Sequence, residues 1–370
     1  MDLNKYENGI KKTGFGLEYK IASQLKQAGW SVINNKYYID DREDDVREID
    51  LVAYKSASIK PFQVYTTLVI SCKKSEQNIW TLLAKEIDLK NPNVDWQPFH
   101  GWTNDKVLDY QLSLSGFSAK YYEDVRRYGV GQALRQPDVE IFAFQELNRE
   151  TGLPQNDKPI FSSITSLMKA QAYELNALPK RKKEAVVYQF NLLSIVETDL
   201  VQLYFSDSEI RASEVDTAQY VARYIINKKE MFSRILFVKS KTFQDVIRDF
   251  DCLHKANCEL FPSLRKDFYS NIFIDSNRIN VLLDDFRKAV SWKLKWSVND
   301  LLVPADIPDF NSITLSIQED NGSLVISIPS SAAALPFLNS DAAVTKHVSI
   351  ALKSIYHYDG AFRFSDECPF

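Results

Sequence analysis

The first quarter of the chain changes from helical to strand-like spacing of its apolar residues. Leu17, Ile21 and Leu25 recur every four positions, which predicts a helix over about residues 11–28 that Gly29 ends. Segments rich in β-branched and aromatic residues then predict strands over residues 30–38, 46–54 and 65–73. This part of the chain is therefore expected to form a helix followed by three strands.

Residues 78–158 interrupt this regularity. They hold Trp80, Trp96 and Trp102 together with several prolines and glycines, and their apolar residues follow no long period. We interpret this segment as an insertion. Residues 1–77 and 159–258 on either side of it would then form one core.

Regular spacing returns after the insertion. A helix is predicted over residues 160–178 and ends at Pro179. Strands are expected over residues 186–196, 200–205 and 235–238, and a helix over residues 242–253. The pattern restarts near residue 259 and predicts a small C-terminal α/β domain over residues 259–370. Its expected elements are a helix around residues 282–294, a hairpin over 313–328 that turns at Asn321-Gly322, and a helix over 342–356.

The composition is typical of a folded, water-soluble protein. The 370 residues are 45% hydrophobic and 25% charged, and a chain of this length forms about two to three domains. The apolar runs are too short to span a bilayer and the N-terminus lacks the apolar segment of an export signal, so we expect a cytoplasmic protein. The net charge of −4 does not by itself indicate nucleic-acid binding, although total charge says little about any one face.

The four cysteines do not form a metal-binding pattern. Cys72, Cys252, Cys258 and Cys368 include no pair separated by two residues. Cys252 and Cys258 flank His254, but this spacing fits no zinc motif and falls largely within a predicted helix. We interpret these residues as packed thiols beside a surface histidine.

Three charged residues occupy positions that packing alone does not explain. Asp50 lies within the apolar segment 49–52, where a half-buried carboxylate is costly unless something compensates it. Lys73 follows the apolar segment 68–72, and Glu18 borders the apolar stripe of the first predicted helix. Each residue alone is more often a solvated charge. Their order along the chain is what suggests a shared site.

The segments around these residues are Gly16-Leu17-Glu18, Arg47-Glu48-Ile49-Asp50-Leu51-Val52 and Val69-Ile70-Ser71-Cys72-Lys73-Lys74-Ser75. They resemble the PD-(D/E)XK nuclease superfamily, most closely its restriction-endonuclease-like branch with the Mrr-type and Holliday-junction-resolvase-type enzymes. The likeness is close from Gly14 to about Trp80 and looser over residues 160–255. It implies an α/β fold with a restriction-endonuclease-like core, in which helices flank a mixed sheet.

The resemblance also implies an activity, a metal and partners. It implies a metal-dependent endonuclease that cleaves nucleic-acid phosphodiester bonds, with DNA as the expected substrate. Glu18 and Asp50 match the metal-binding acids of the family and Lys73 matches its catalytic lysine. One Mg²⁺ or Mn²⁺ would then be held by Glu18, Asp50 and the backbone carbonyl of Cys72. Family habit further suggests a homodimer, a role in bacterial defence against foreign DNA, and a partner protein in such a system.

The sequence departs from the family pattern at Ser71, because the family has an acid two residues before the lysine. Ser71 is expected on the same strand face as Lys73, and its hydroxyl is a weak ligand for a hard cation. Glu48 could supply a replacement carboxylate. Two alternatives therefore stay open. One is a catalytically degenerate member that binds nucleic acid or a partner protein without cleaving, and the other is an unrelated α/β scaffold in which Glu18, Asp50 and Lys73 never meet.

Several residues outside this site are candidate contacts for nucleic acid. One is Lys74, which follows Lys73. Two more, Lys169 and Gln171, lie on the second core helix, and the last group is the run Lys180-Arg181-Lys182-Lys183. A basic run after a helix is more often solvated. Trp80, Trp96 and Trp102 could stack on bases, but core packing is the better explanation of these aromatic residues.

Overall fold

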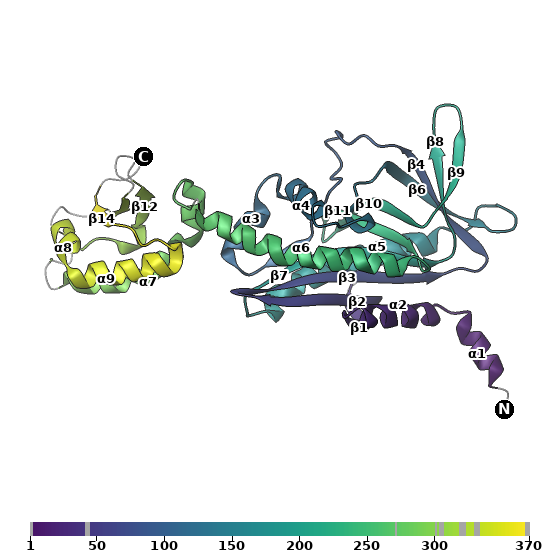
Figure 1. Ribbon diagram of the computed structural model, residues 1–370, viewed down its shortest axis with the longest axis horizontal. Coiled ribbons are helices and arrows are strands. Elements are labelled where there is room, and N and C mark those ends of the chain that lie inside the picture. The colour runs from purple at the N-terminus through teal and green to yellow at the C-terminus, as the bar shows by residue number, and fades with distance from the viewer. Residues whose placement is uncertain are drawn as a thin grey trace. The chain divides into compact units, whose positions relative to one another are not determined.

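The computed structural model describes residues 3–40, 45–270, 272–299, 302, 307–317, 323–328 and 334–366. The chain divides into two compact units, each with its own helices and strands (Figure 1). The first unit comprises residues 1–105 and 112–262, and the second comprises residues 106–111 and 263–370. This is an α/β protein with mixed sheets flanked by helices, as the sequence predicted. Across the described ranges, no helix combines the length and the apolar character needed to cross a membrane.

The first unit is built on a mixed sheet. Its strands in spatial order are β1 (Ser31–Ile39), β2 (Val46–Ile59), β3 (Phe62–Lys74), β7 (Val186–Glu197), β11 (Lys229–Lys239) and β10 (Thr217–Ile226), and the short β5 (Gly101–Thr103) also pairs with β7. β1, β2 and β3 form an antiparallel meander, whereas β3, β7 and β11 run parallel. Parallel neighbours require a long crossover connection, which the chain between β3 and β7 provides.

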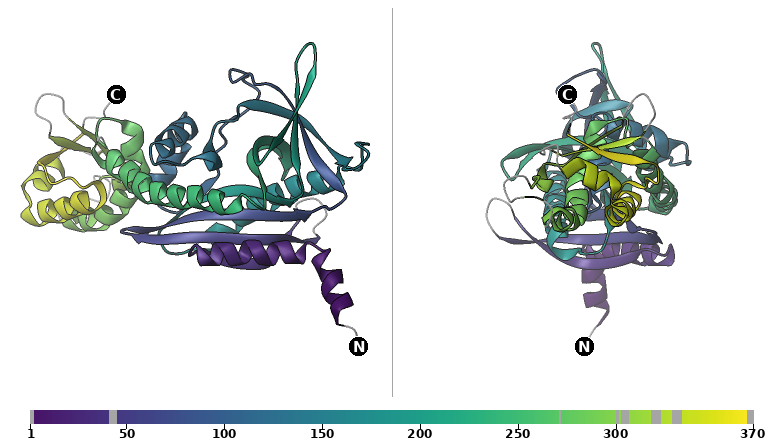
Figure 2. Two further views of the ribbon diagram at one scale, coloured as in Figure 1. Left: turned by 45° about the vertical axis from the view of Figure 1, so that its right-hand side comes forward. Right: turned by 90° about the vertical axis from the view of Figure 1, so that its left-hand side faces the viewer.

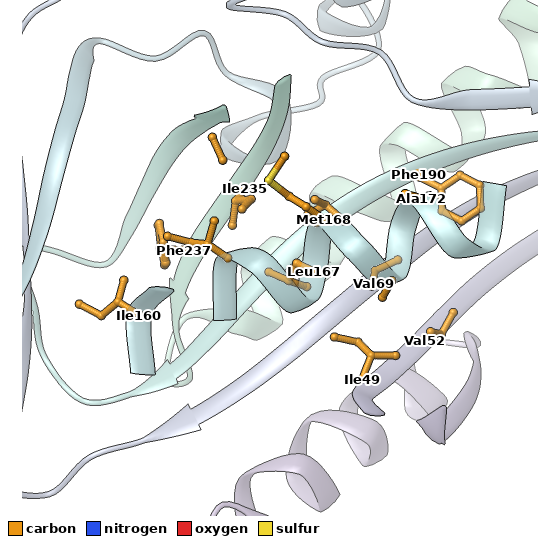
Figure 3. Close-up of a cluster of buried hydrophobic side chains, with 14 of the residues drawn as sticks. Ile49, Val52, Val69, Ile160, Leu167, Met168, Ala172, Phe190, Ile235 and Phe237 are labelled. Atoms are coloured by element: carbon orange, nitrogen blue, oxygen red, sulfur yellow. The ribbon is translucent and has the colours of Figure 1, made fainter. Parts of the chain in front are cut away.

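Helix α5 (Lys158–Arg181) covers one face of this sheet. Its Leu167 and Met168 are fully buried and belong to the same apolar core as Val69 of β3 and Phe237 of β11 (Figure 3). Strand β7 is buried along almost its whole length, as expected for a central parallel strand with both faces covered.

The opposite face of the sheet carries α2 (Phe15–Gln27) and α6 (Phe243–Ser270). Helix α2 buries Leu17, Ile21 and Leu25, the stripe that the sequence predicted, and the short α1 (Asn4–Lys11) precedes it. Helix α6 is bonded to β3 through Asn257, whose Nδ2 donates to Thr66 Oγ1 at 2.9 Å. Thr66 is three residues from Val69, so it points to the face away from α5.

A second sheet in the first unit joins residues on both sides of α5 in sequence. Its order is β6 (Val139–Asn148), β4 (Asn78–Glu86), β8 (Leu200–Phe205) and β9 (Ile210–Val215), and the β8–β9 hairpin projects from the unit (Figure 2). The segment 78–158 therefore supplies two strands to a sheet completed by residues 200–215. It also contains α3 (Lys106–Ser113), α4 (Phe117–Arg126) and the 3₁₀ turn at Gln132–Leu134.

The second unit combines two long helices with a small sheet. Its elements are α7 (Ser276–Asn299), the 3₁₀ turn Phe310–Ser312, β12 (Thr314–Ile317), β13 (Leu324–Ser327), α8 (Ala334–Ser340), α9 (Ala342–Tyr356) and β14 (Phe362–Ser365). The predicted hairpin is confirmed in its antiparallel strands β12 and β13, whereas the expected turn at Asn321-Gly322 lies outside the described residues. Asp341 caps α9 by accepting from the amides of Ala343 and Val344.

Two predicted helix ends were wrong, and both helices continue past a proline. Helix α5 continues through Pro179 to Arg181, and α6 continues through Pro262 to Ser270 instead of ending near residue 253. A proline inside a helix costs roughly 3 kcal/mol. In α6 that cost is offset because Phe261 and Phe268 are fully buried on either side of Pro262.

We predict that Trp80→Phe destabilises the first unit by about 2 kcal/mol. Trp80 is 1% exposed, and its indole Nε1 donates to Glu146 Oε1 at 2.7 Å. The substitution leaves the buried Glu146 carboxylate with one donor fewer. Urea unfolding measures the loss, and Trp292→Phe at a 74% exposed position is the matched control, expected to change stability by less than about 0.5 kcal/mol. Equal stabilities of the two variants would contradict this assignment.

Candidate functional site

The strands β2 and β3 separate at one end, and the space between them holds Asp50. Their ladder runs from the Ile59–Phe62 pair to the Leu51–Ile70 pair. One residue beyond it, the Asp50 carboxylate takes the place of a backbone acceptor, because the amide of Cys72 donates to its Oδ2 at 2.5 Å. We call this place the β2–β3 fork.

A fault in the neighbouring β1–β2 ladder sets the orientation of the residues at the fork. Asn35 and Asp50 form no ladder pair, although pairing continues on both sides of them, and Asn35 has a φ of 50°. Ile49 and Val52 are three residues apart, yet both join the core beneath α5 (Figure 3). Strict alternation would place them on opposite faces, so the strand rotates at Asp50. Asn35 then donates from Nδ2 to the carboxylate of Glu48.

Lys73 and Glu18 complete the fork. The Lys73 ammonium lies 3.7 Å from Asp50 Oδ2, and both side chains are partly exposed. Burial raises the pKa of Glu18 above its usual value, and the charges of Asp50 and Glu48 raise it further, while Lys73 opposes them. The structure therefore brings together Glu18 from α2, Glu48 and Asp50 from β2, and Lys73 from β3. Of the three carboxylates, Asp50 forms the ion pair with Lys73.

Ser71 and Cys72 point to opposite faces of β3. Ser71 is paired in register with Ser194 of β7, whose hydroxyl lies 2.8 Å from that of Ser163 on α5. Ser71 is fully buried toward α5, and its own hydroxyl has no hydrogen-bond partner. The Cys72 thiol projects from the other face, where burial and then the charges of Asp50 and Glu18 hold its pKa well above the usual range. The Ser71 hydroxyl therefore forms no hydrogen bond with the carboxylates of the fork.

The donor set at the fork fits one divalent cation rather than a closed metal cage. Within the part of the chain that the structure describes, no three His, Cys, Asp or Glu side chains converge as metal ligands. Asp50 and Glu18 supply carboxylate oxygens. Burial, and after it the charge of Asp50, raises the pKa of Glu18, and a bound cation would favour its ionised form. A hard ion with few protein ligands retains water, as Mg²⁺ does.

The basic and amide residues proposed for nucleic-acid contact near the core are engaged within the protein. Lys74 donates from Nζ to the Lys11 carbonyl at 2.7 Å, and Lys169 pairs with the buried Asp40 at 2.7 Å. Gln171 is 1% exposed and lies inside the core. These three residues are held by internal contacts instead of facing solvent together.

The basic run 180–183 lies at the other end of the sheet from the fork. It ends just before Val186, which pairs with Gln63 at the start of β3, whereas Lys73 is at the end of that strand. Ten residues of strand separate the two places by about 33 Å. Within the run, Arg181 pairs with Glu174 at 3.1 Å and Lys182 lies over the Tyr65 ring, and both Lys180 and Lys183 are exposed.

The structure also shows the surroundings of the three tryptophans and of the cysteine–histidine group near residue 254. Trp80 and Trp96 are buried, and Trp102 packs against the core, so none of these rings is free to stack on a base. His254 is half-buried, with its Nδ1 3.1 Å from Thr66 Oγ1 and its Nε2 3.7 Å from the Cys258 thiol. Cys368 lies outside the described residues.

Comparison with known proteins finds no relative of this chain. No family model matches the chain, and neither a curated protein nor a solved structure is significantly similar to it. The residues at the fork therefore have to be interpreted from their own chemistry.

We predict that Glu18→Gln stabilises the protein at pH 7.5 by about 0.5 kcal/mol, a small value because Glu18 is partly exposed. The folded-state pKa of Glu18 is raised, so the folded protein carries a penalty for ionising it above that pKa. The penalty disappears below the unfolded-state pKa, where the carboxyl is protonated in both states. The difference in unfolding free energy should therefore close as the pH falls toward 4.

Urea unfolding of Glu18→Gln and wild type at pH 7.5 and pH 4 measures this difference. The exposed Glu7 on α1 provides the control, because Glu7→Gln changes a carboxylate that lies on a helix without buried residues. A Glu18→Gln variant less stable than wild type at pH 7.5 would show that ionised Glu18 carries no penalty in the folded protein.

Proposed function

We propose that the β2–β3 fork is the active site of a metal-dependent endonuclease of the PD-(D/E)XK type that cleaves DNA. The observation that carries the proposal is the meeting of Glu18, Asp50 and Lys73, which come from a helix and two strands far apart in sequence. Their order along α2, β2 and β3, within a mixed sheet flanked by helices, supports the same reading. The restriction-endonuclease-like core is part of this proposal.

The chemistry of a phosphodiester suits this set of groups. Negative charge builds up on the non-bridging oxygens in the transition state, and the Lys73 ammonium at the open edge of the fork can stabilise it. Asp50 and Glu18 would hold a Mg²⁺ or Mn²⁺ ion, which polarises the phosphate and lowers the pKa of a bound water. The bond from the Cys72 amide fixes one Asp50 oxygen, so the carboxylate is oriented before any ligand arrives.

Asn35 and Glu48 act one step further from the reaction in this proposal. The Asn35 amide donates to Glu48, and Glu48 adds a third negative charge to the fork. Glu48 thus stands where it can compensate for the carboxylate that Ser71 does not supply. We assign Glu48 as a positioning residue.

We predict that Asp50→Asn and Lys73→Ala each lower metal-dependent cleavage at least 100-fold, since each removes a charge that stabilises the transition state. The assay incubates the purified full chain with labelled duplex DNA, single-stranded DNA and RNA, in Mg²⁺, Mn²⁺ and EDTA. Lys183→Ala is the control, because this exposed lysine lies at the other end of the sheet. Cleavage that survives both fork substitutions would place the active site elsewhere.

We predict that Ser71→Ala leaves cleavage unchanged and raises stability by up to about 1 kcal/mol. The variant removes a buried hydroxyl that has no hydrogen-bond partner. Ser194→Ala is the matched control, because its hydroxyl is bonded to Ser163 and its loss should destabilise the protein by about 1 kcal/mol. A large loss of cleavage in Ser71→Ala would instead make Ser71 a ligand or a substrate contact.

The second candidate function is binding of nucleic acid without cleavage. It is favoured by the direction of Ser71 and by the small number of ligands that the described residues bring to the fork. It predicts no product in either metal and an affinity for DNA that Asp50→Asn does not weaken. The cleavage assay above therefore separates the two functions.

A further inference from the structure

Two exposed tryptophans stand on the outer face of α7 in the second unit. Trp292 is 74% exposed and Trp296 is 62% exposed. The opposite side of the helix is anchored in the core of the unit, where Val290 and Leu294 are fully buried. Trp292 follows Val290 by two residues, about 200° around the helix, so the rings face away from that core. Large aromatic surfaces left in water mark interaction sites more often than chance exposure.

Lysines share this face with the two rings. Residues 288–299 contain Lys288, Lys293 and Lys295 and no aspartate or glutamate. Lys288 and Lys295 are exposed, and the Lys293 ammonium lies 4.6 Å from the centre of the Trp296 ring. Positive charge and flat aromatic surface are therefore interleaved over three turns of one helix.

A groove of about 610 Å³ runs beside this face. Its lining includes Trp292, Lys295, Asn299, Asp309, Phe310 and Asn311. The apolar wall and the amide side chains offer both a stacking surface and hydrogen-bond partners, and the volume is in the range of small-ligand pockets. Its acidic member, Asp309, is engaged with Ser312 Oγ at 2.7 Å and the Asn311 amide at 3.0 Å.

We infer that Trp292, Trp296 and the three lysines, here called the α7 surface, bind single-stranded nucleic acid. Bases stack on exposed indole rings, and lysine ammonium groups beside them neutralise the phosphates. The groove can receive an unstacked base, whose edge would reach Asn299 or Asn311. This surface is separate from the β2–β3 fork and binds whether or not the fork cleaves.

The observations favour this ligand over two others. A second copy of the chain docked symmetrically on the α7 surface would place lysines against lysines, which is unfavourable. An anionic membrane would attract the same residues but would make no use of the amides that line the groove. Charge complementarity together with those hydrogen-bonding groups points to nucleic acid.

Fluorescence anisotropy of labelled 20-nucleotide oligo(dT) and oligo(U), with the full chain in EDTA, tests this inference. We predict that Trp292→Ala combined with Trp296→Ala weakens binding at least tenfold. Replacing Lys288, Lys293 and Lys295 with glutamine should lower the salt dependence by about two in the slope of log affinity against log salt concentration. The two oligonucleotides distinguish DNA from RNA as the preferred strand.

The controls use the same unit of the protein. Ile274→Ala and Lys266→Gln change an exposed apolar and an exposed basic residue away from the α7 surface, and both should bind like wild type. Circular dichroism checks that each variant is folded. The binding assay contains EDTA and reports affinity alone, so failure of the proposed cleavage and failure of this binding are distinguishable.

Three results would overturn the inference. The first is absence of oligonucleotide binding by wild type, and the second is affinity of the double tryptophan variant within twofold of wild type. The third is a shift of tryptophan emission to shorter wavelength on vesicles of phosphatidylcholine and phosphatidylserine, without oligonucleotide binding, which would assign the α7 surface to a membrane.

Discussion

The parallel ladder between β3 and β7 is the constraint on which the first unit depends. It joins residues 63–74 with residues 186–197 and is buried on both faces, so its position leaves little freedom to the strands around it. The antiparallel meander fixes β2 against β3 on one side, and β11 continues the parallel direction on the other. Because β3 cannot shift by one residue without turning its apolar side chains to the wrong face, the place of Lys73 at its end is fixed as well.

The fork shows how a sheet can hold charge at the edge of a buried core. Where the β2–β3 ladder stops, a backbone amide would lack an acceptor, and the Asp50 carboxylate satisfies it. The same residue lies in the fault of the β1–β2 ladder, where Asn35 takes a left-handed backbone conformation. The interruption of the strand ladders at Asp50 therefore lets its carboxylate accept from the Cys72 amide, and it brings Glu48 and Asp50 near Glu18. Burial first, and then the charges of Asp50 and Glu48, raise the pKa of Glu18, and a cation at the fork would offset both effects.

Charge and aromatic surface are distributed unevenly along this chain, which whole-chain totals conceal. The net charge of −4 suggests no affinity for nucleic acid, yet the outer face of α7 carries three lysines and two exposed indole rings over residues 288–299. The tryptophans at positions 80, 96 and 102, by contrast, pack within the first unit. Exposure, rather than residue type, distinguishes a ring that supports the core from one that is available to a ligand.

The sequence alone determined the α/β class, the helices carrying Leu17 and Leu167 and most of the strands of the first sheet, and it suggested Glu18, Asp50 and Lys73 as a set. These depend on local periodicity and on charges placed in apolar segments. Only the tertiary structure decided that Ser71 faces α5, that Gln171 is buried, and that Pro179 and Pro262 lie inside helices. Those outcomes depend on strand pairing and packing between residues far apart in sequence. Local spacing carries no signal of a ladder fault such as the one at Asn35 and Asp50, or of which tryptophans stay in water.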